Sequence, residues 1–213
     1  MKFLKYKKII IVCVSIIIFI VGYFTGTFSK YYLKTESVKK MIVINDRLAI
    51  NNELYLPLES YGFCEQLGEL FALTDLRQQV YTIKGQNPKN YLCLVNDGQE
   101  LIYQSQKINP LTIYNFNPTK ISISDYRTLD DSKIDIADID LVKQVASYIN
   151  GDNIAETPSI VLIIKRLLFT SISFPGIALE YQYEHDVYGD CYITNLAACT
   201  TWKIGHEIMS QIQ

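Results

Sequence analysis

The feature that most constrains this chain is a charge-free apolar stretch close to its start. Residues 9–29 carry no charged side chain, and Ile9 to Phe24 is almost wholly apolar. As an α-helix, about 20 such residues are roughly 30 Å long, which matches the hydrocarbon thickness of a bilayer. The sequence therefore predicts a transmembrane helix at 9–28 that binds the lipid bilayer, between a cytoplasmic tail at 1–8 and a juxtamembrane linker at 29–40.

The alternative for this stretch is a secretory signal that is cleaved from the mature protein. A signal usually has a shorter apolar core followed by a small-x-small cleavage site, and Thr27-Phe28-Ser29 fits that pattern poorly. Cys13 lies inside the apolar run with no lipobox before it, which argues against a lipoprotein. Four lysines in the first eight residues favour a cytoplasmic N-terminus. We expect a retained single-pass anchor in the cell membrane, with the C-terminal domain extracytoplasmic.

The charge of the chain is distributed unevenly. From Met41 onward there are 12 basic and 21 acidic side chains, a formal charge of −9. Such a domain repels phosphate backbones, so the sequence predicts no nucleic-acid partner. The same charge suggests one function, protection of the membrane against a cationic peptide.

Residues 41–108 form a first region, which is expected to be a β-rich subdomain of short strands separated by turn residues. Asn45-Asp46-Arg47 and Asn51-Asn52 are typical turns, and Asp97-Gly98 is typical of a two-residue hairpin. The strands are expected at 41–44, 48–50, 53–56, 67–73, 79–84, 91–95 and 100–104.

Residues 119–213 form a second region, separated from the first by the polar, proline-containing segment 109–118. Its apolar residues predict a helix that Asp138 caps and that ends at Asn150. Strands are expected at 121–126, 160–169, 177–184, 191–194 and 199–203, followed by a short helix containing Ile204 and Ile208. The expected fold class is α+β: an N-terminal transmembrane helix followed by a mostly antiparallel β ectodomain with one mid-chain helix and a short C-terminal helix.

Four cysteines, Cys64, Cys93, Cys191 and Cys199, lie in the expected ectodomain, where an oxidising setting permits disulfides. Only Cys191 with Cys199 has local support, because a hairpin between them would bring their strands together. The alternative is that the thiols fill the buried face of the sheet. The chain has no C-x-x-C, so neither a redox pair nor a zinc knuckle is indicated.

The sequence contains none of the common catalytic, nucleotide-binding or calcium-binding motifs. We therefore assign no catalytic, cofactor-binding or metal-ligating residue and no cofactor. Glu184-His185-Asp186 is interpreted as a turn rather than a metal cluster, because adjacent strand residues point to opposite faces. His206-Glu207 is interpreted as the start of a helix. The acidic residues of 130–140 are interpreted as a solvated, helix-capping segment.

Aromatic residues gather in the second region and indicate either a recognition surface or core packing. They are Tyr181, Tyr183, Tyr188, Tyr192 and Trp202.

Three stretches resemble poorly characterised membrane-anchored envelope proteins of low-GC Gram-positive bacteria. They are Val80 to Gly85 leading into Asn96-Asp97-Gly98, the helix from Asp138 to Asn150, and Phe174 to Ile177 before a tyrosine-rich strand. The resemblance implies an envelope location and fold, and it provides no catalytic residue. This chain lacks the lipobox cysteine that many such proteins carry.

These observations predict a non-enzymatic binding or accessory domain with a protein or peptide partner. The alternatives are the protective function above and a wall-facing enzyme that uses the dispersed carboxylates Glu180, Glu184 and Asp190. The sequence does not indicate an oligomeric state.

Overall fold

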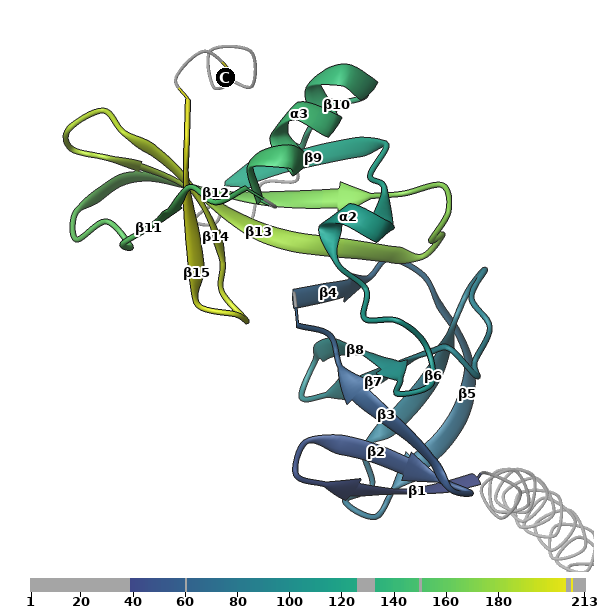
Figure 1. Ribbon diagram of the computed structural model, residues 1–213. Coiled ribbons are helices and arrows are strands. Elements are labelled where there is room, and N and C mark those ends of the chain that lie inside the picture. The colour runs from purple at the N-terminus through teal and green to yellow at the C-terminus, as the bar shows by residue number, and fades with distance from the viewer. Residues whose placement is uncertain (1–38, 60, 126–132, 150, 206–207, 209–213) are drawn as a thin grey trace, which may run out of the picture. The chain divides into compact units, whose positions relative to one another are not determined.

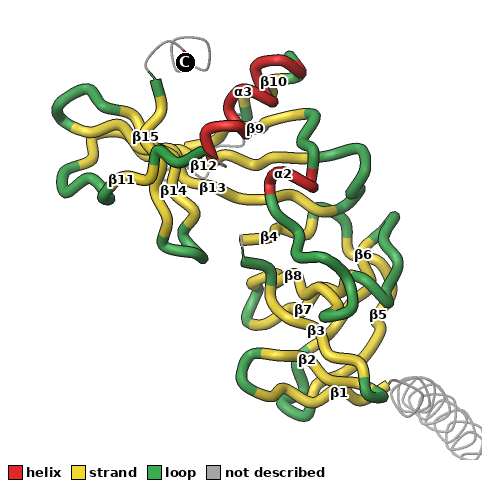
Figure 2. Tube along the Cα trace, in the orientation of Figure 1, coloured by secondary structure: helices red, strands yellow, loops and turns green. Residues whose placement is uncertain are grey.

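The computed structural model describes residues 39–59, 61–125, 133–149, 151–205 and 208, which form fifteen strands and two helices. Figure 2 shows how strands dominate this part of the chain. The described residues from Lys40 onward belong to one compact unit. The predicted transmembrane helix at 9–28 lies outside the described residues. Among the residues that are described, no helix is long and apolar enough to cross a membrane.

The expected α+β class is wrong, because the described residues are mostly β. They contain only two helices, α2 (Ile113–Phe116) and α3 (Ile139–Ile149). The helix predicted after Asp138 is confirmed as α3. The predicted C-terminal helix lies mostly outside the described residues, and Ile204 ends strand β15 (Thr200–Ile204). Ile204 continues the strand because Trp202 and Ile204 are both buried with Lys203 exposed between them, which is the two-residue period of a strand.

Seven antiparallel strands of the first region form a closed barrel, in the order β1-β2-β3-β8-β7-β6-β5 (Figure 1). Two-residue turns at Asn45-Asp46, Asn51-Asn52 and Asp97-Gly98 connect neighbouring strands, and all their residues have positive φ. This is the conformation that matches the twist of a hairpin. The strands are β1 (Lys39–Ile44), β2 (Arg47–Ile50), β3 (Glu53–Pro57), β5 (Leu67–Thr74), β6 (Gln79–Ile83), β7 (Tyr91–Asn96) and β8 (Gln99–Ser105).

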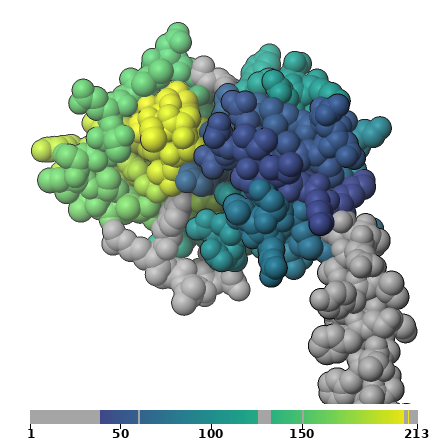
Figure 3. Space-filling model, turned by 90° about the horizontal axis from the view of Figure 1, so that it is seen from below, coloured from purple at the N-terminus to yellow at the C-terminus, as the bar shows by residue number. Residues whose placement is uncertain are grey.

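Apolar side chains fill the barrel, whose first strands are purple and blue in the space-filling view (Figure 3). Tyr55 is buried in this interior, and its hydroxyl donates to the carbonyl oxygen of Pro88 at 3.0 Å. The barrel is therefore a packed core, which consists of Met41, Leu48, Ile50, Tyr55, Ala72, Val80, Leu92, Leu94 and Tyr103.

The second region forms an antiparallel sheet in the order β10-β9-β12-β13-β14-β15-β11, with β4 as an additional partner of β13. The longest strands, β12 and β13, pair over most of their length. The sheet strands are β4 (Tyr61–Cys64), β9 (Lys120–Asp125), β10 (Ile134–Ile136), β11 (Ile154–Ala155), β12 (Val161–Thr170), β13 (Ile177–Asp186) and β14 (Cys191–Asn195), together with β15.

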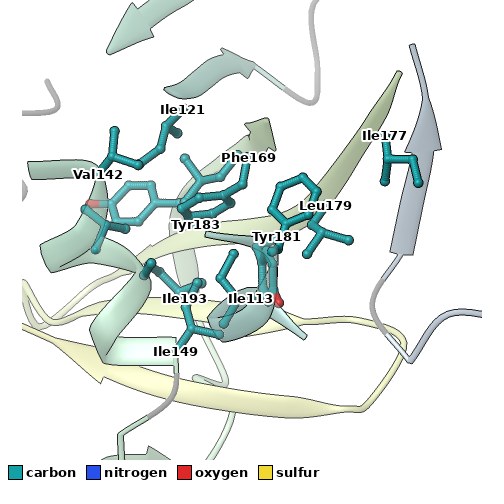
Figure 4. Close-up of a cluster of buried hydrophobic side chains, with 14 of the residues drawn as sticks. Ile113, Ile121, Val142, Ile149, Phe169, Ile177, Leu179, Tyr181, Tyr183 and Ile193 are labelled. Atoms are coloured by element: carbon teal, nitrogen blue, oxygen red, sulfur yellow. The ribbon is translucent and has the colours of Figure 1, made fainter. Parts of the chain in front are cut away.

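Helix α3 covers one face of this sheet. Its first turn is capped by Asp138, whose side chain accepts hydrogen bonds from the backbone N–H groups of Asp140 and Leu141 at 3.0 and 3.2 Å. Figure 4 shows Val142 and Ile149 of the helix packing against sheet residues such as Tyr183 and Ile193. The opposite face of β13 carries Glu180, Gln182, Glu184 and Asp186, because side chains alternate along a strand.

Strand β4 connects the two regions, because it lies between barrel strands in the sequence and pairs with β13 in the sheet. The backbone N–H of Leu58, just before β4, donates to the carbonyl oxygen of Ile102 in β8 at 3.1 Å. The core under the sheet also includes Cys64 of β4 together with Cys93 and Ile102 of the barrel. One continuous core therefore joins the second sheet to strands β7 and β8.

Candidate functional site

A cleft of about 540 Å³ lies where strand β4, the β7–β8 hairpin and the polar face of β12 and β13 meet. Gly62 forms part of its wall, and an added Cβ there would lie 2.6 Å from Cδ1 of Leu58. The residues that line the cleft are Tyr61, Gly62, Phe63, Gly98, Gln99, Glu100, Leu101, Arg166 and Glu180.

Arg166 places a fixed positive charge in the cleft. Its Nη2 donates to Oε2 of Glu180 at 2.6 Å, and the guanidinium carbon lies 5.4 Å from the centre of the Phe63 ring. The Glu180 side chain is 13% exposed and the Arg166 side chain 34%, so solvent reaches the cation more than its partner. The ion pair and the aromatic ring together hold the guanidinium in one place.

Glu100 adds a second carboxylate to the cleft. Its Oε2 atom is buried and has no hydrogen-bond partner in the structure. Burial raises the pKa of this carboxyl above its ordinary value, because the charged form loses hydration. Glu100 is therefore a hydrogen-bond acceptor with unused capacity at the wall of the cleft.

The Sγ atoms of Cys64 and Cys93 lie next to this carboxylate. The two Sγ atoms and a carboxylate oxygen of Glu100 are all within 4.8 Å of one another. Both cysteines are free and buried. A hydrogen bond between the thiols lowers the pKa of Cys64 and raises the pKa of Cys93. The cluster is the only group of three potential metal ligands within the described ranges.

The structure does not bring the three carboxylates of the enzyme hypothesis together in the cleft. Of these, Glu180 alone lines it. Glu184 is buried and accepts a hydrogen bond from Gln182. Asp190 pairs with Lys203 at 2.6 Å at the start of β14.

The other polar residues discussed from the sequence have structural roles where they are described. Asp186 accepts hydrogen bonds from the backbone of Tyr188 and Asp190 at 2.9 and 2.8 Å and closes a turn. Burial opposes the ionisation of Asp186, but these hydrogen bonds outweigh it and lower its pKa. Asp135 pairs with Lys120 at 3.3 Å. His206, Glu207, Asp130 and Asp131 lie outside the described residues.

The aromatic residues of the second sheet are mostly core residues. Tyr181, Tyr183, Tyr192 and Trp202 are buried, and only Tyr188, in the turn after β13, is largely exposed. Phe169 of β12 packs edge-to-face on Tyr181 with the ring centres 5.5 Å apart. Core packing, rather than a recognition surface, therefore explains the four buried residues of this group.

Of the two possibilities considered for Cys191 and Cys199, the structure does not contain the disulfide. Both cysteines are free, and β14 pairs with β15 so that Cys191 faces Ile204 while Asn195 faces Thr200 next to the hairpin turn. Cys199 lies in that turn, whereas Cys191 is at the far end of β14. The length of the strand, roughly 13 Å at about 3.3 Å per residue, therefore separates the two cysteines. Cys191 is buried, with its Sγ 3.3 Å from the Tyr183 hydroxyl, as the alternative predicts.

Sequence analysis did not identify Cys64, Cys93 and Glu100 as a group. The proximity of two of these residues could have been predicted, because the predicted Asp97-Gly98 hairpin places Cys93 and Glu100 on neighbouring strands. Cys93 faces Ile102 and Val95 faces Glu100 across the pair, so the two side chains lie on one face. Cys64 arrives from β4, a strand that the sequence did not predict.

No family model, curated protein or solved structure matches this chain. The resemblance to membrane-anchored envelope proteins stays a prediction.

Proposed function

We propose that this chain is a membrane-tethered, non-enzymatic binding protein whose cleft accepts a basic group of a peptide. The observation that carries the proposal is the composition of the cleft, in which Glu100 and Glu180 outnumber the single cation, Arg166. Tyr61 and Phe63 add aromatic rings, which favour cations through their faces. The cleft thus combines a net negative formal charge with apolar walls, as small binding sites commonly do.

Glu100 is the acceptor for the ligand in this proposal. Glu180 already holds Arg166 at 2.6 Å, whereas Oε2 of Glu100 has no hydrogen-bond partner in the structure. An ammonium or guanidinium group that reaches Glu100 supplies the hydrogen bond that this buried oxygen lacks. Hydrogen bonds to a charged group contribute roughly 1.5–3 kcal/mol, which corresponds to about 10- to 100-fold in affinity.

Two features of the sequence support capture of a cationic peptide at the outer face of the cell membrane. The apolar segment 9–28 is long enough to hold the chain in a bilayer. The formal charge of −9 beyond Met41 attracts cationic peptides and raises their local concentration near the cleft. A protein of this kind would intercept a cationic peptide close to the bilayer, which is the protective role suggested by the sequence.

The test is to measure the binding of a fluorescent lysine-rich peptide to the full-length protein in nanodiscs of uncharged lipid. We expect Glu100→Gln to weaken binding by about 10-fold or more, because the neutral amide oxygen is a weaker acceptor for a cation than a carboxylate oxygen. Glu156→Gln is the matched control: it removes the same charge from an exposed residue that does not line the cleft.

Salt provides a second readout, since it screens charges that are exposed to solvent. Binding by the wild-type protein should weaken as salt is added. The proposal fails if the peptide does not bind, if Glu100→Gln and Glu156→Gln weaken binding equally, or if binding is insensitive to salt.

A further inference from the structure

Three separate strands bring two thiols and a carboxylate to one point beside the cleft. Cys64 comes from β4, Cys93 from β7 and Glu100 from β8. Their ligand atoms lie within 4.8 Å of one another. Around a tetrahedral zinc ion, two sulfur ligands at about 2.3 Å are roughly 3.8 Å apart, so a small contraction would bring these atoms into coordination.

The chemistry of the three groups fits zinc better than the other divalent metals common in proteins. Thiolates are soft ligands and favour zinc over magnesium or calcium, while one carboxylate oxygen is compatible with zinc. Two thiolates and one carboxylate carry a formal charge of −3, which a divalent ion reduces to −1. The ion would also give a charged partner to the Glu100 carboxylate, whose Oε2 atom is buried without a hydrogen-bond partner in the structure.

We propose that Cys64, Cys93 and Glu100 bind one zinc ion, with water as the fourth ligand. The two cysteines bind as thiolates, so each loses its proton to solvent when the metal enters, and no electron is transferred. A disulfide between Cys64 and Cys93 is the competing outcome for two neighbouring thiols. That bond would leave the Glu100 carboxylate buried beside it without a partner, whereas zinc uses all three groups.

The site goes beyond the proposed peptide binding but shares Glu100 with it, so zinc and a cationic group of the peptide would compete for that carboxylate. Cys64 and Cys93 do not line the cleft, so their substitution separates the two ideas. A failure of zinc binding leaves the peptide experiment unaffected. A failure of peptide binding leaves the metal site intact.

The experiment uses the full-length protein in mild detergent, reduced and freed of metal, and then titrated with Co²⁺ as a spectroscopic probe for zinc. We expect one ion per chain, with thiolate-to-cobalt charge-transfer absorption and the intense visible bands of a tetrahedral site. Added zinc should displace the cobalt and raise the melting temperature, since a ligand of the folded state stabilises it.

Cys64→Ser and Cys93→Ser should each weaken zinc binding by more than about 100-fold, because even the loss of an outer-shell partner costs about 10- to 100-fold. Cys199→Ser is the matched control, since it removes an exposed thiol outside the cluster and should leave binding unchanged. Glu100→Gln should retain charge-transfer absorption with weaker binding.

Circular dichroism of each variant checks that it is folded. If Cys93→Ser does not fold, Cys64→Ser and Glu100→Gln still test the site. The proposal is overturned if cobalt gives no thiolate absorption, if the folded Cys64→Ser variant binds zinc like the wild type, or if peptide mapping of protein from membranes finds Cys64 and Cys93 joined as a disulfide.

Discussion

The barrel and the second sheet differ in where their polar side chains lie. The barrel closes on itself and fills its interior with apolar side chains, from Met41 to Tyr103. The second sheet has two faces, one under α3 and one that carries Glu180 and Glu184. Closing a sheet removes its edges, whereas an open sheet keeps a second face on which polar groups can be placed. The cleft lies where a hairpin of the barrel meets that polar face, so the combination of the two regions creates it.

The strongest test of this comparison is whether the two regions unfold together. We expect Phe169→Ala, in the core under the sheet, to lower the free energy of unfolding by about 3–5 kcal/mol, because Phe169 is fully buried. Leu92→Ala, inside the barrel, should cost about 2–5 kcal/mol. Denaturant unfolding of the full-length protein, followed by circular dichroism, measures both.

Both substitutions should shift the same transition. Cys93 and Ile102 of the barrel belong to the core under the sheet, so neither core is complete without the other. Two transitions, each sensitive to only one of the substitutions, would show that the regions unfold independently and would break the comparison.

An intermediate effect is expected at the contact between the loops before β13 and after β6. Gly176 has a φ of +78°, and an added Cβ would lie 2.7 Å from the carbonyl oxygen of Lys84. Gly176→Ala should therefore lower the free energy of unfolding by about 1–3 kcal/mol through strain in the backbone, in addition to the clash.

Gly98→Ala is the control for Gly176→Ala. Gly98 has a φ of +80°, but an added Cβ there meets nothing within 4 Å. The difference between the two variants isolates the loop contact from the backbone strain. Equal losses of stability would mean that the contact contributes nothing.

The smallest effect is a pH dependence on the polar face of the sheet. Burial raises the pKa of Glu184. This effect outweighs the hydrogen bonds with Gln182 and Thr194, which lower the pKa. An acid with a raised pKa in the folded state makes the protein less stable as pH rises above the unfolded value. Glu184→Gln removes this cost, so it should stabilise the protein at pH 7 and have little effect near pH 4.

Thermal melts of wild type and Glu184→Gln across this pH range provide the measurement. The stabilisation should grow as pH rises from about 4 through the folded pKa. A variant that is less stable than the wild type at pH 7 would indicate that the charged carboxylate is stabilised on this face rather than merely tolerated.

Local signals in the sequence were sufficient for most strands and for α3. The Asp97-Gly98 turn and the alternating run from Ile177 to Glu184 each encode their conformation within a few residues, and both predictions are confirmed. Closure of the barrel was not predictable in this way. It depends on contacts such as the hydrogen bond from Asp75 N–H to the Met41 carbonyl oxygen, which joins residues distant in the sequence.

The candidate site was largely beyond sequence reasoning for the same reason. Tyr61 to Cys64 show no alternation that would identify a strand, and they become β4 because β13 offers them a partner. That pairing brings Cys64 to Cys93 and Phe63 to Arg166. Only the relation between Cys93 and Glu100 was encoded locally, in the hairpin that joins their strands.

The early position of β4 has a consequence for how the chain emerges from the ribosome. Residues 61–64 are made long before residues 177–180, with which they pair. Until then β4 lacks its partner strand β13, and an unpaired strand can pair with another chain. An assay of stalled nascent chains of increasing length for aggregation would detect when this interval ends.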